Sequence, residues 1–145
     1  MSTITTIQHT LTTSTALSLC QAAIDYAEQI EITICVSVVC LSGRTLASAN
    51  MNHAPILSHS IANRKAITAA SFQLPTKEWQ SRLAERTPIL MALQSEPDFT
   101  YIGGGLPISI DNEIVAAIGI SGGSEQQDID CATAALQSIT NLLQD

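Results

Sequence analysis

Two ionisable side chains stand in segments whose other residues are mostly small or apolar. Lys65 follows Arg64 in the alanine-rich segment SIANRKAITAASF, and Asp128 falls in the first turn of the last predicted helix. An ammonium in such surroundings either extends its head to solvent or points into a pocket, where a lowered pKa would make it a base or a Schiff-base amine. Asp128 is either a catalytic carboxylate or a partner of the helix dipole. Lys65 and Asp128 are therefore our candidate acid/base residues, with a structural ion pair as the equal alternative for Lys65.

Basic side chains are concentrated in one part of an acidic chain. The net charge is −7, yet five of the six basic residues lie between positions 64 and 86. This cluster is either a solvated helical face or a local attraction for the carboxylate or phosphate of a small ligand. On the second interpretation Arg64 is a candidate ligand-binding residue. A net charge of −7 is incompatible with a broad basic surface, so we expect no nucleic-acid partner.

Six of the seven glycines lie between positions 103 and 123. Gly103, Gly104 and Gly105 precede an apolar strand, and Gly122 ends the next one. A glycine triplet can offer backbone N–H groups to an anion, or it can form a sharp bend or bulge. The pattern is not a P-loop, because no G-K-[ST] follows, and not a dinucleotide fingerprint, because a strand follows the glycines. We predict that these four glycines contribute to a ligand site.

The cysteines and histidines show no metal-binding spacing. No C-x-x-C pair, H-x-x-x-H pattern or H-E-x-x-H pattern occurs, so the spacing predicts no catalytic or structural metal site. The cysteines all lie in apolar segments, which predicts buried, reduced thiols. These residues are Cys20, Cys35, Cys40 and Cys131.

Hydrophobic periodicity and turn residues predict the elements that position these groups. We expect a helix capped by Thr13 or Ser14, a hairpin of strands 33–41 and 44–51, a helix from Ser58 or Ser60 to Phe72, two short helices ending at Leu83 and Leu93, a hairpin of strands 106–110 and 114–120, and a final helix after Ser124. Asp111 and Asn112 predict the turn of the second hairpin, and the apolar run after them predicts a strand covered on both faces. Ser124 and Gln127 match a capping box, and Thr76 is expected to cap the first of the two short helices. Two hairpins exclude an all-parallel sheet. With a short extended segment before the glycines, the order predicts an α+β domain with a five-stranded antiparallel sheet.

Composition limits the class of protein further. The chain has 145 residues, of which 46% are hydrophobic and 13% charged. We expect a flexible leader over residues 1–12 and a single domain over 13–145, with some surface buried in a homo-oligomer. No apolar run reaches the ~18 residues that a membrane span needs. The first residues do not resemble a secretory signal, so we expect no membrane partner and a cytoplasmic location.

Four pieces of the chain together resemble one known family. The pieces are VSVVCLSGRTLASANM, SIANRKAITAASF, the block GGGLPI…VAAIGISGG, and the acidic D-x-D-x-A start of the last helix. They resemble the GlcG/HbpS family, which includes the C-terminal domain of PduO-type proteins, and the resemblance spans residues 11–143. It implies a profilin-like three-layer α/β/α sandwich and oligomers, often dimers that assemble further. Some members bind haem and are linked to haem degradation or redox sensing, and others belong to glycolate or diol metabolism.

The resemblance makes haem a candidate cofactor. His53 lies in a loop after a predicted strand, beside Met51, and either side chain could approach a haem iron. His53 is therefore our candidate metal ligand, with an exposed loop histidine as the alternative. His9 could ligate iron from a mobile leader, and His59 could equally cap a helix. The resemblance also places Lys65 at the family's K-A helix position, which favours the pocket-lining role.

These observations predict a small-molecule-binding protein, with haem as a candidate ligand. The pocket is expected between the second helix and the glycine-rich hairpin, with Met51, His53, Arg64 and Lys65 facing it. One alternative is an enzyme acting on a small hydroxy acid or carbonyl compound, with Lys65 and Asp128 as acid and base. Another is a structural or assembly subunit without a ligand.

Overall fold

The structure is a computed structural model that describes residues 3–144. Its elements, in chain order, are α1 (Thr13–Gln29), β1 (Cys35–Cys40), β2 (Thr45–Asn50), α2 (Ser58–Phe72), α3 (Glu78–Leu83), α4 (Thr87–Gln94), β3 (Gly105–Ile110), β4 (Glu113–Ser121) and α5 (Glu125–Gln144). Within this range no helix is both long and apolar enough to span a bilayer. The order of helices and hairpins agrees with the α+β prediction.

The strands form one open antiparallel sheet in the order β2-β1-β4-β3. The sheet has four strands, so the prediction of five was wrong. The segment before the glycines was expected to supply the fifth strand. Its backbone groups instead pair with side chains: Thr76 donates to the carbonyl of Ile102, and Gln80 donates to that of Tyr101. Those groups are engaged outside the sheet, so the segment adds no strand to it.

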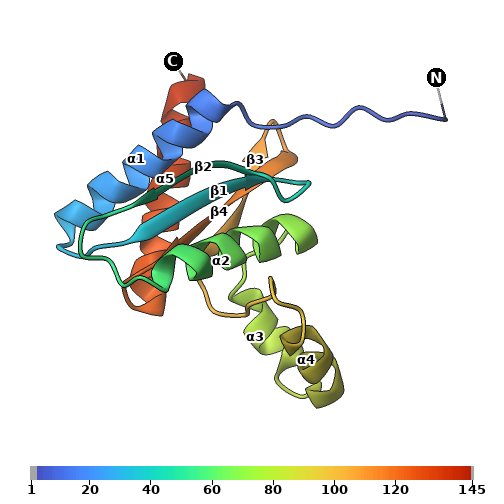
Figure 1. Cartoon of the computed structure of the whole chain (residues 1–145). Helices are drawn as coiled ribbons and strands as arrows, with labels where there is room; N and C mark the ends of the chain where they lie inside the picture. The colour runs from blue at the N-terminus through green and yellow to red at the C-terminus, as the bar shows by residue number, and fades with distance from the viewer. Residues whose placement is uncertain (1–2, 145) are drawn as a thin grey trace.

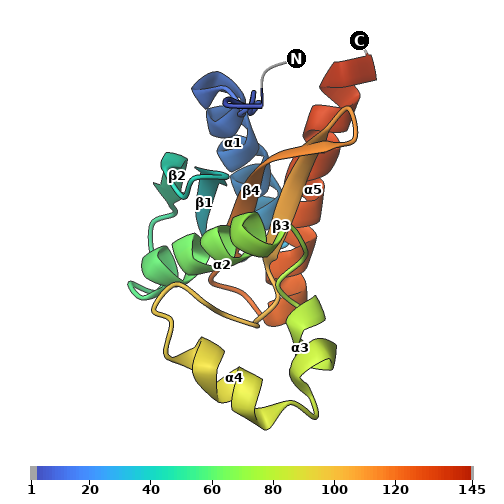
Figure 2. The ribbon, with the colours of Figure 1, turned by 90° about the vertical axis from the view of Figure 1, so that its right-hand side faces the viewer.

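Helices cover both faces of the sheet (Figure 1, Figure 2). Helix α2 lies on one face, while α1 covers β1 and β2 and α5 covers β3 and β4 on the other. Side chains alternate between the two layers, because Val36 and Val38 join the core under α1 and α5 whereas Val39 packs on α2. The prediction that the apolar strand after Asp111-Asn112 is covered on both faces is confirmed. The profilin-like arrangement stays a prediction.

Helix α2 lies unusually close to the sheet because the facing side chains are small. Ala62, Ala66 and Ala69 are almost fully buried against β1 and β4. A Cβ on Gly119 of β4 would collide with the carbonyl oxygen of Ala62 and lie 2.5 Å from the amide nitrogen of Ala66. The glycine therefore sets the distance between α2 and the sheet.

Local capping and turn chemistry follow the sequence closely. Asp111 and Asn112 have φ values of 52° and 65°, which is the positive-φ pair of a two-residue hairpin turn. At the start of α5, Ser124 and Gln127 bond reciprocally between backbone and side chain, which forms a capping box as predicted. Helix α1 differs, because its cap is Thr12 rather than Thr13 or Ser14. The Thr12 hydroxyl accepts a hydrogen bond from the Thr15 amide.

Helices α3 and α4 form an arm that projects from the sheet layers (Figure 1, Figure 2). Edge-to-face contacts among Phe72, Trp79 and Phe99 stabilise its base, with ring centroids 4.8 to 6.3 Å apart. Helix α4 buries none of its residues. The arm therefore depends on its aromatic base.

All four cysteines are buried free thiols, as predicted. Burial raises the pKa of Cys20 to about 11 and that of Cys131 to about 12. Burial would also raise the pKa of Cys40, but hydrogen bonds to its sulfur, including one from Ser42 at 3.0 Å, lower it overall. Cys40 is thus the most acidic of these three thiols.

Candidate functional site

Lys65 and Asp128 form a buried ion pair that joins α2 to α5. Their side chains approach at the end of β4, where the Lys65 Nζ donates to Asp128 Oδ2 at 2.9 Å and to the carbonyl of Ile120 at 2.8 Å. The residues are 1% and 3% exposed. Burial raises the pKa of Asp128, while the Lys65 ammonium acts to lower it. Asp128 Oδ1 also accepts from the Gly123 amide, so each charged group has protein partners.

The second glycine of the triplet packs directly on this pair. Gly104 has a φ of +127°, which an L side chain rarely adopts. A Cβ there would lie 2.8 Å from the Lys65 Nζ and 2.7 Å from the Ile120 carbonyl oxygen. The space beside Gly104 is therefore filled by the Lys65 ammonium and the Ile120 carbonyl of the chain itself. The structure brings together three predicted site residues, Lys65, Gly104 and Asp128.

Thr76 fixes the other side of the glycine triplet. It is fully buried, its hydroxyl donates to the Ile102 carbonyl at 2.8 Å, and it accepts from the Gly105 amide at 3.0 Å. The sequence indicated Thr76 only as a cap for the next helix. Its partners Ile102 and Gly105 lie 26 and 29 positions further along the chain. The residues next to Thr76 in the sequence therefore could not predict these contacts.

Glu125 holds the first glycine of the triplet. Its carboxylate accepts from the Gly103 amide at 2.9 Å and from the Gln80 side chain at 2.6 Å, and Gln80 also donates to the Tyr101 carbonyl. The hydrogen bond from Gly103 is the main cause that lowers the pKa of Glu125. The charged carboxylate thus links α3, the glycine segment and α5. Sequence reasoning missed both Gln80 and Glu125.

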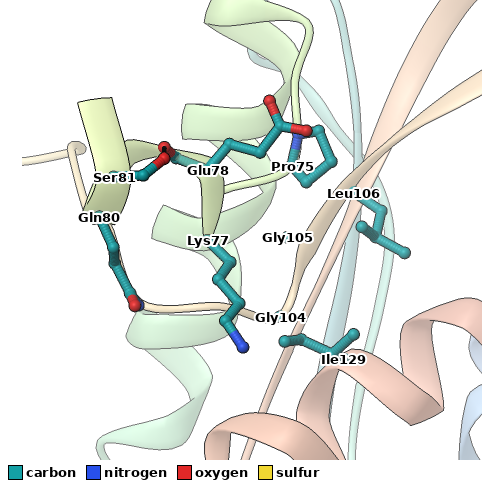
Figure 3. A pocket seen from close by; sticks show the side chains of 9 residues that line it. All are labelled: Pro75, Lys77, Glu78, Gln80, Ser81, Gly104, Gly105, Leu106 and Ile129. Carbon is teal, nitrogen blue, oxygen red and sulfur yellow. Dashed lines mark hydrogen bonds between the residues drawn. The ribbon is translucent and has the colours of Figure 1, made fainter.

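A hollow of about 450 Å³ opens beside this segment, between α3 and the start of β3 (Figure 3). Its lining residues are Pro75, Lys77, Glu78, Gln80, Ser81, Gly104, Gly105, Leu106 and Ile129. The Lys77 side chain extends toward Gly104 and Ile129 (Figure 3). Lys77, rather than Lys65 or Arg64, is the cation that lines this hollow. The arrangement suits a small ligand with an apolar body and an anionic group.

A second hollow, of about 520 Å³, lies where the N-terminal segment crosses the β3–β4 hairpin. The side chain of His9 lines it, and the ring Nδ1–H donates to Glu113 Oε2 at 2.9 Å. The hydrogen bond to Glu113 raises the pKa of His9. Within the described residues Nε2 makes no hydrogen bond, so this nitrogen is open to a ligand. The hollow has an apolar wall formed by Leu11, Ile110, Val115 and Ile139.

The remaining predicted residues lie outside both hollows. His53 is exposed, with a φ of 72°, in the loop before α2. The Met51 sulfur accepts a hydrogen bond from the Ile34 amide at 3.3 Å. Gly122 has a φ of +139°, and a Cβ there would collide with the Thr33 carbonyl oxygen, so it packs against the chain. His59 is exposed, with Nδ1 3.1 Å from the Asn50 side-chain oxygen. None of these contacts joins them to Lys65.

The fold and these hollows define a small α+β domain with an open antiparallel sheet and room for small ligands beside it. The chain belongs to the HbpS-like family, described as haem degrading protein HbpS-like, whose sequence model matches residues 11–137. The resemblance stated from the sequence is thereby confirmed.

Two relatives show how far this similarity extends. An uncharacterized 15.0 kDa protein in the dhaT-dhaS intergenic region of Citrobacter freundii is 30% identical over 134 residues, which cover 92% of this chain and 94% of that protein. The corrinoid adenosyltransferase PduO of Salmonella typhimurium is 32% identical over 136 residues, 88% of this chain. The match spans only 40% of PduO, so this chain corresponds to less than half of that protein.

Solved structures confirm the fold. Klebsiella pneumoniae protein ORFY superposes with a TM-score of 0.88 at 29% identity, covering 97% of each chain. A double mutant of Streptomyces reticuli HbpS superposes with a TM-score of 0.86 at 31% identity, covering 96% of this chain and 93% of that one. The PduOC:heme complex superposes with a TM-score of 0.81 at 30% identity, covering 89% and 94%. One of these neighbours thus carries haem.

Proposed function

We propose that this chain is a small-molecule-binding protein whose ligand is haem, with His9 as the iron ligand. The observation that carries the proposal is the His9–Glu113 hydrogen bond at the edge of an apolar hollow. A ligating histidine commonly donates its second ring N–H to a carboxylate, which orients the ring and raises its basicity. With Nδ1 directed to Glu113, the lone pair of neutral His9 is on Nε2, where iron would bind.

The walls of the hollow suit a porphyrin. Leu11 and Val115 are at most 7% exposed and present apolar surface, while Thr12 and Thr15 border it with hydroxyl groups. A volume of about 520 Å³ lies within the usual range of ligand sites. Haem would supply redox and oxygen chemistry at its iron. His9 would hold the iron, Glu113 would orient the His9 ring, and Leu11, Ile110, Val115 and Ile139 would contact the apolar face of the porphyrin.

A hemin titration of histidine variants tests this assignment. Purified wild-type protein should give a saturable Soret shift, which His9→Ala should abolish or weaken at least tenfold. His53→Ala and His59→Ala are matched controls, and both should titrate as wild type does. Loss of the shift in His53→Ala, with His9→Ala unchanged, would instead support the assignment made from the sequence. A flat wild-type titration would remove haem as the ligand.

The hollow at the glycine bend favours a second kind of small ligand. The Lys77 side chain extends toward Gly104 and Ile129, and Leu106 adds apolar surface (Figure 3). Glu78 also lines the hollow, and its carboxylate points away from the Lys77 ammonium (Figure 3). A carboxylate with a short apolar body matches this combination of charge and surface. Thermal-shift measurements with short-chain carboxylates test it, and Lys77→Met should remove any shift. In this proposal the ligand site lies between α3 and β3, rather than between the second helix and the glycine-rich hairpin, and its cation is Lys77 rather than Lys65.

We assign Lys65 and Asp128 a structural role in place of acid/base chemistry. Both side chains are buried and bonded to each other, and neither lines the two hollows described above. A catalytic group must reach the proton it moves, whereas the polar atoms of this pair are bonded to each other and to the backbone of Ile120 and Gly123. Self-association and a cytoplasmic location stay predictions, and light scattering of the purified protein tests the first.

A further inference from the structure

A third hollow lies on the α2 face of the sheet, at the edge that α2 leaves uncovered. Its volume is about 450 Å³, and its lining residues are Ser37, Thr45, Ser48, His59, Ser60, Asn63, Arg64 and Asp98. Every one of them is polar. The strand register explains part of this set, because Ser37 and Ser48 are direct partners across β1 and β2 and therefore point to the same face.

The Asn63 amide directs two hydroxyl groups in this hollow. Its Nδ2 donates to Ser37 Oγ at 2.9 Å and to Thr45 Oγ1 at 3.0 Å. Both hydroxyl oxygens act as acceptors in these bonds, so each retains its own O–H as a donor. Within the described residues neither O–H has an acceptor. Ser37 is only 2% exposed, and a buried O–H without an acceptor is costly unless a water or a ligand supplies one.

Arg64 adds a cation that no carboxylate of the described residues neutralises. It is half-buried in α2, and among the described residues no carboxylate oxygen lies within 4.0 Å of its guanidinium. A guanidinium presents five N–H donors in a planar fork that matches the oxygens of a carboxylate or a phosphate. Asp98, on the exposed rim, is the one acid in the lining and can accept from a hydroxyl of the ligand.

We infer that this hollow, defined by Arg64, Asn63 and Ser37, binds a small oxyanion, the carboxylate or phosphate group of a metabolite. Among the described residues, the O–H groups of Ser37 and Thr45 have no acceptor and Arg64 has no ion pair, and the Ser37 hydroxyl is buried. This site is separate from the two hollows of the proposed function. The sequence indicated Arg64 as a ligand-binding residue of the pocket beside the glycine-rich hairpin. The structure instead places Arg64 in this polar hollow.

Titrations with inorganic phosphate and with acetate, followed by NMR shifts of the Ser37 and Ser48 amides, test the inference. At least one anion should give saturable shifts at these amides, and the anion that does so identifies the phosphate or the carboxylate as the group bound. Arg64→Gln should weaken that binding at least tenfold, and Ser37→Ala should weaken it severalfold. Arg86→Gln, which removes the same charge from the exposed arm, should leave it unchanged.

Two results would overturn the inference. One is the absence of saturable shifts with both anions. The other is equal affinity in wild type and Arg64→Gln when circular dichroism shows both folded. Hemin binding of Arg64→Gln should equal that of wild type, because Arg64 does not line the His9 hollow. Failure of the oxyanion site is therefore distinguishable from failure of the haem proposal.

Discussion

His9 and Glu113 meet at 2.9 Å although 104 positions separate them in the sequence. Their side chains are 70% and 50% exposed, so water screens the pair and it adds little to stability. Its consequence is orientation, because the Nδ1–H that His9 donates to Glu113 leaves Nε2 as the ring nitrogen with a lone pair for a ligand. The haem proposal rests on this relationship.

Hemin affinity should fall in mild acid. Glu113 raises the pKa of His9 above its ordinary value of about 6.5, and only the neutral ring can ligate iron. Binding should therefore be full above the raised pKa and weaken as pH decreases through it. Glu113→Gln should move this midpoint to lower pH, because the proton on His9 loses its carboxylate partner. Dissociation constants measured from pH 5 to 8 in both proteins check this, and identical midpoints would contradict it.

Breaking the buried ion pair should destabilise the fold strongly. Asp128→Asn leaves the Lys65 ammonium buried without a countercharge, which costs about 3–5 kcal/mol of unfolding free energy. The double variant Lys65→Met/Asp128→Asn removes both charges and should cost less than the sum of Lys65→Met and Asp128→Asn measured singly. Urea denaturation measures all three. Asp130→Asn, which alters an exposed side-chain contact with Gln126, is the control and should cost under about 1 kcal/mol. Additive costs for the pair would show that it is not coupled.

Gly119 and Gly43 should respond differently to the same substitution. Gly119→Ala places a methyl group against the Ala62 carbonyl and should force α2 from the sheet, at a cost of about 3 kcal/mol. Gly43 has a φ of +87° but no atom within 4 Å of a Cβ, so Gly43→Ala should cost only about 1–2 kcal/mol. Thermal and urea unfolding compare the two. A larger loss for Gly43→Ala would refute the close packing of α2.

The thiols should react in a fixed order. Cys40 has a lowered pKa, whereas burial raises the pKa of Cys20 to about 11 and that of Cys131 to about 12. Since the thiolate is the nucleophile, iodoacetamide at pH 8 should modify Cys40 well before the other two. Peptide mass spectrometry of partially labelled protein reports the order. Ser42→Ala should slow the reaction at Cys40, because it removes a hydrogen bond to the sulfur.

Features determined by neighbouring residues were predictable from the sequence. The turn at Asp111 and Asn112 and the capping box of Ser124 and Gln127 involve residues at most three positions apart, so local patterns reveal them. The burial of both faces of β4 follows from its continuous apolar run.

Features that depend on distant partners were not predictable in this way. The expected fifth strand is absent because Thr76, Gln80 and Glu125 bind the backbone of residues 101–105, from 21 to 29 positions away. The two readings of Lys65 could be separated only by locating Asp128, 63 positions further along. His9 appeared to be a residue of the N-terminal leader because Glu113, which orients it, lies 104 positions away in the β3–β4 hairpin.

Ligand rescue of a histidine cavity tests the central claim most directly. The His9→Gly variant, mixed with hemin, should lack the Soret and visible bands of the wild-type complex. Adding millimolar imidazole should restore them, because free imidazole can occupy the place of the missing ring. Wild-type bands in His9→Gly without imidazole would contradict the account, since iron would then be held by another residue.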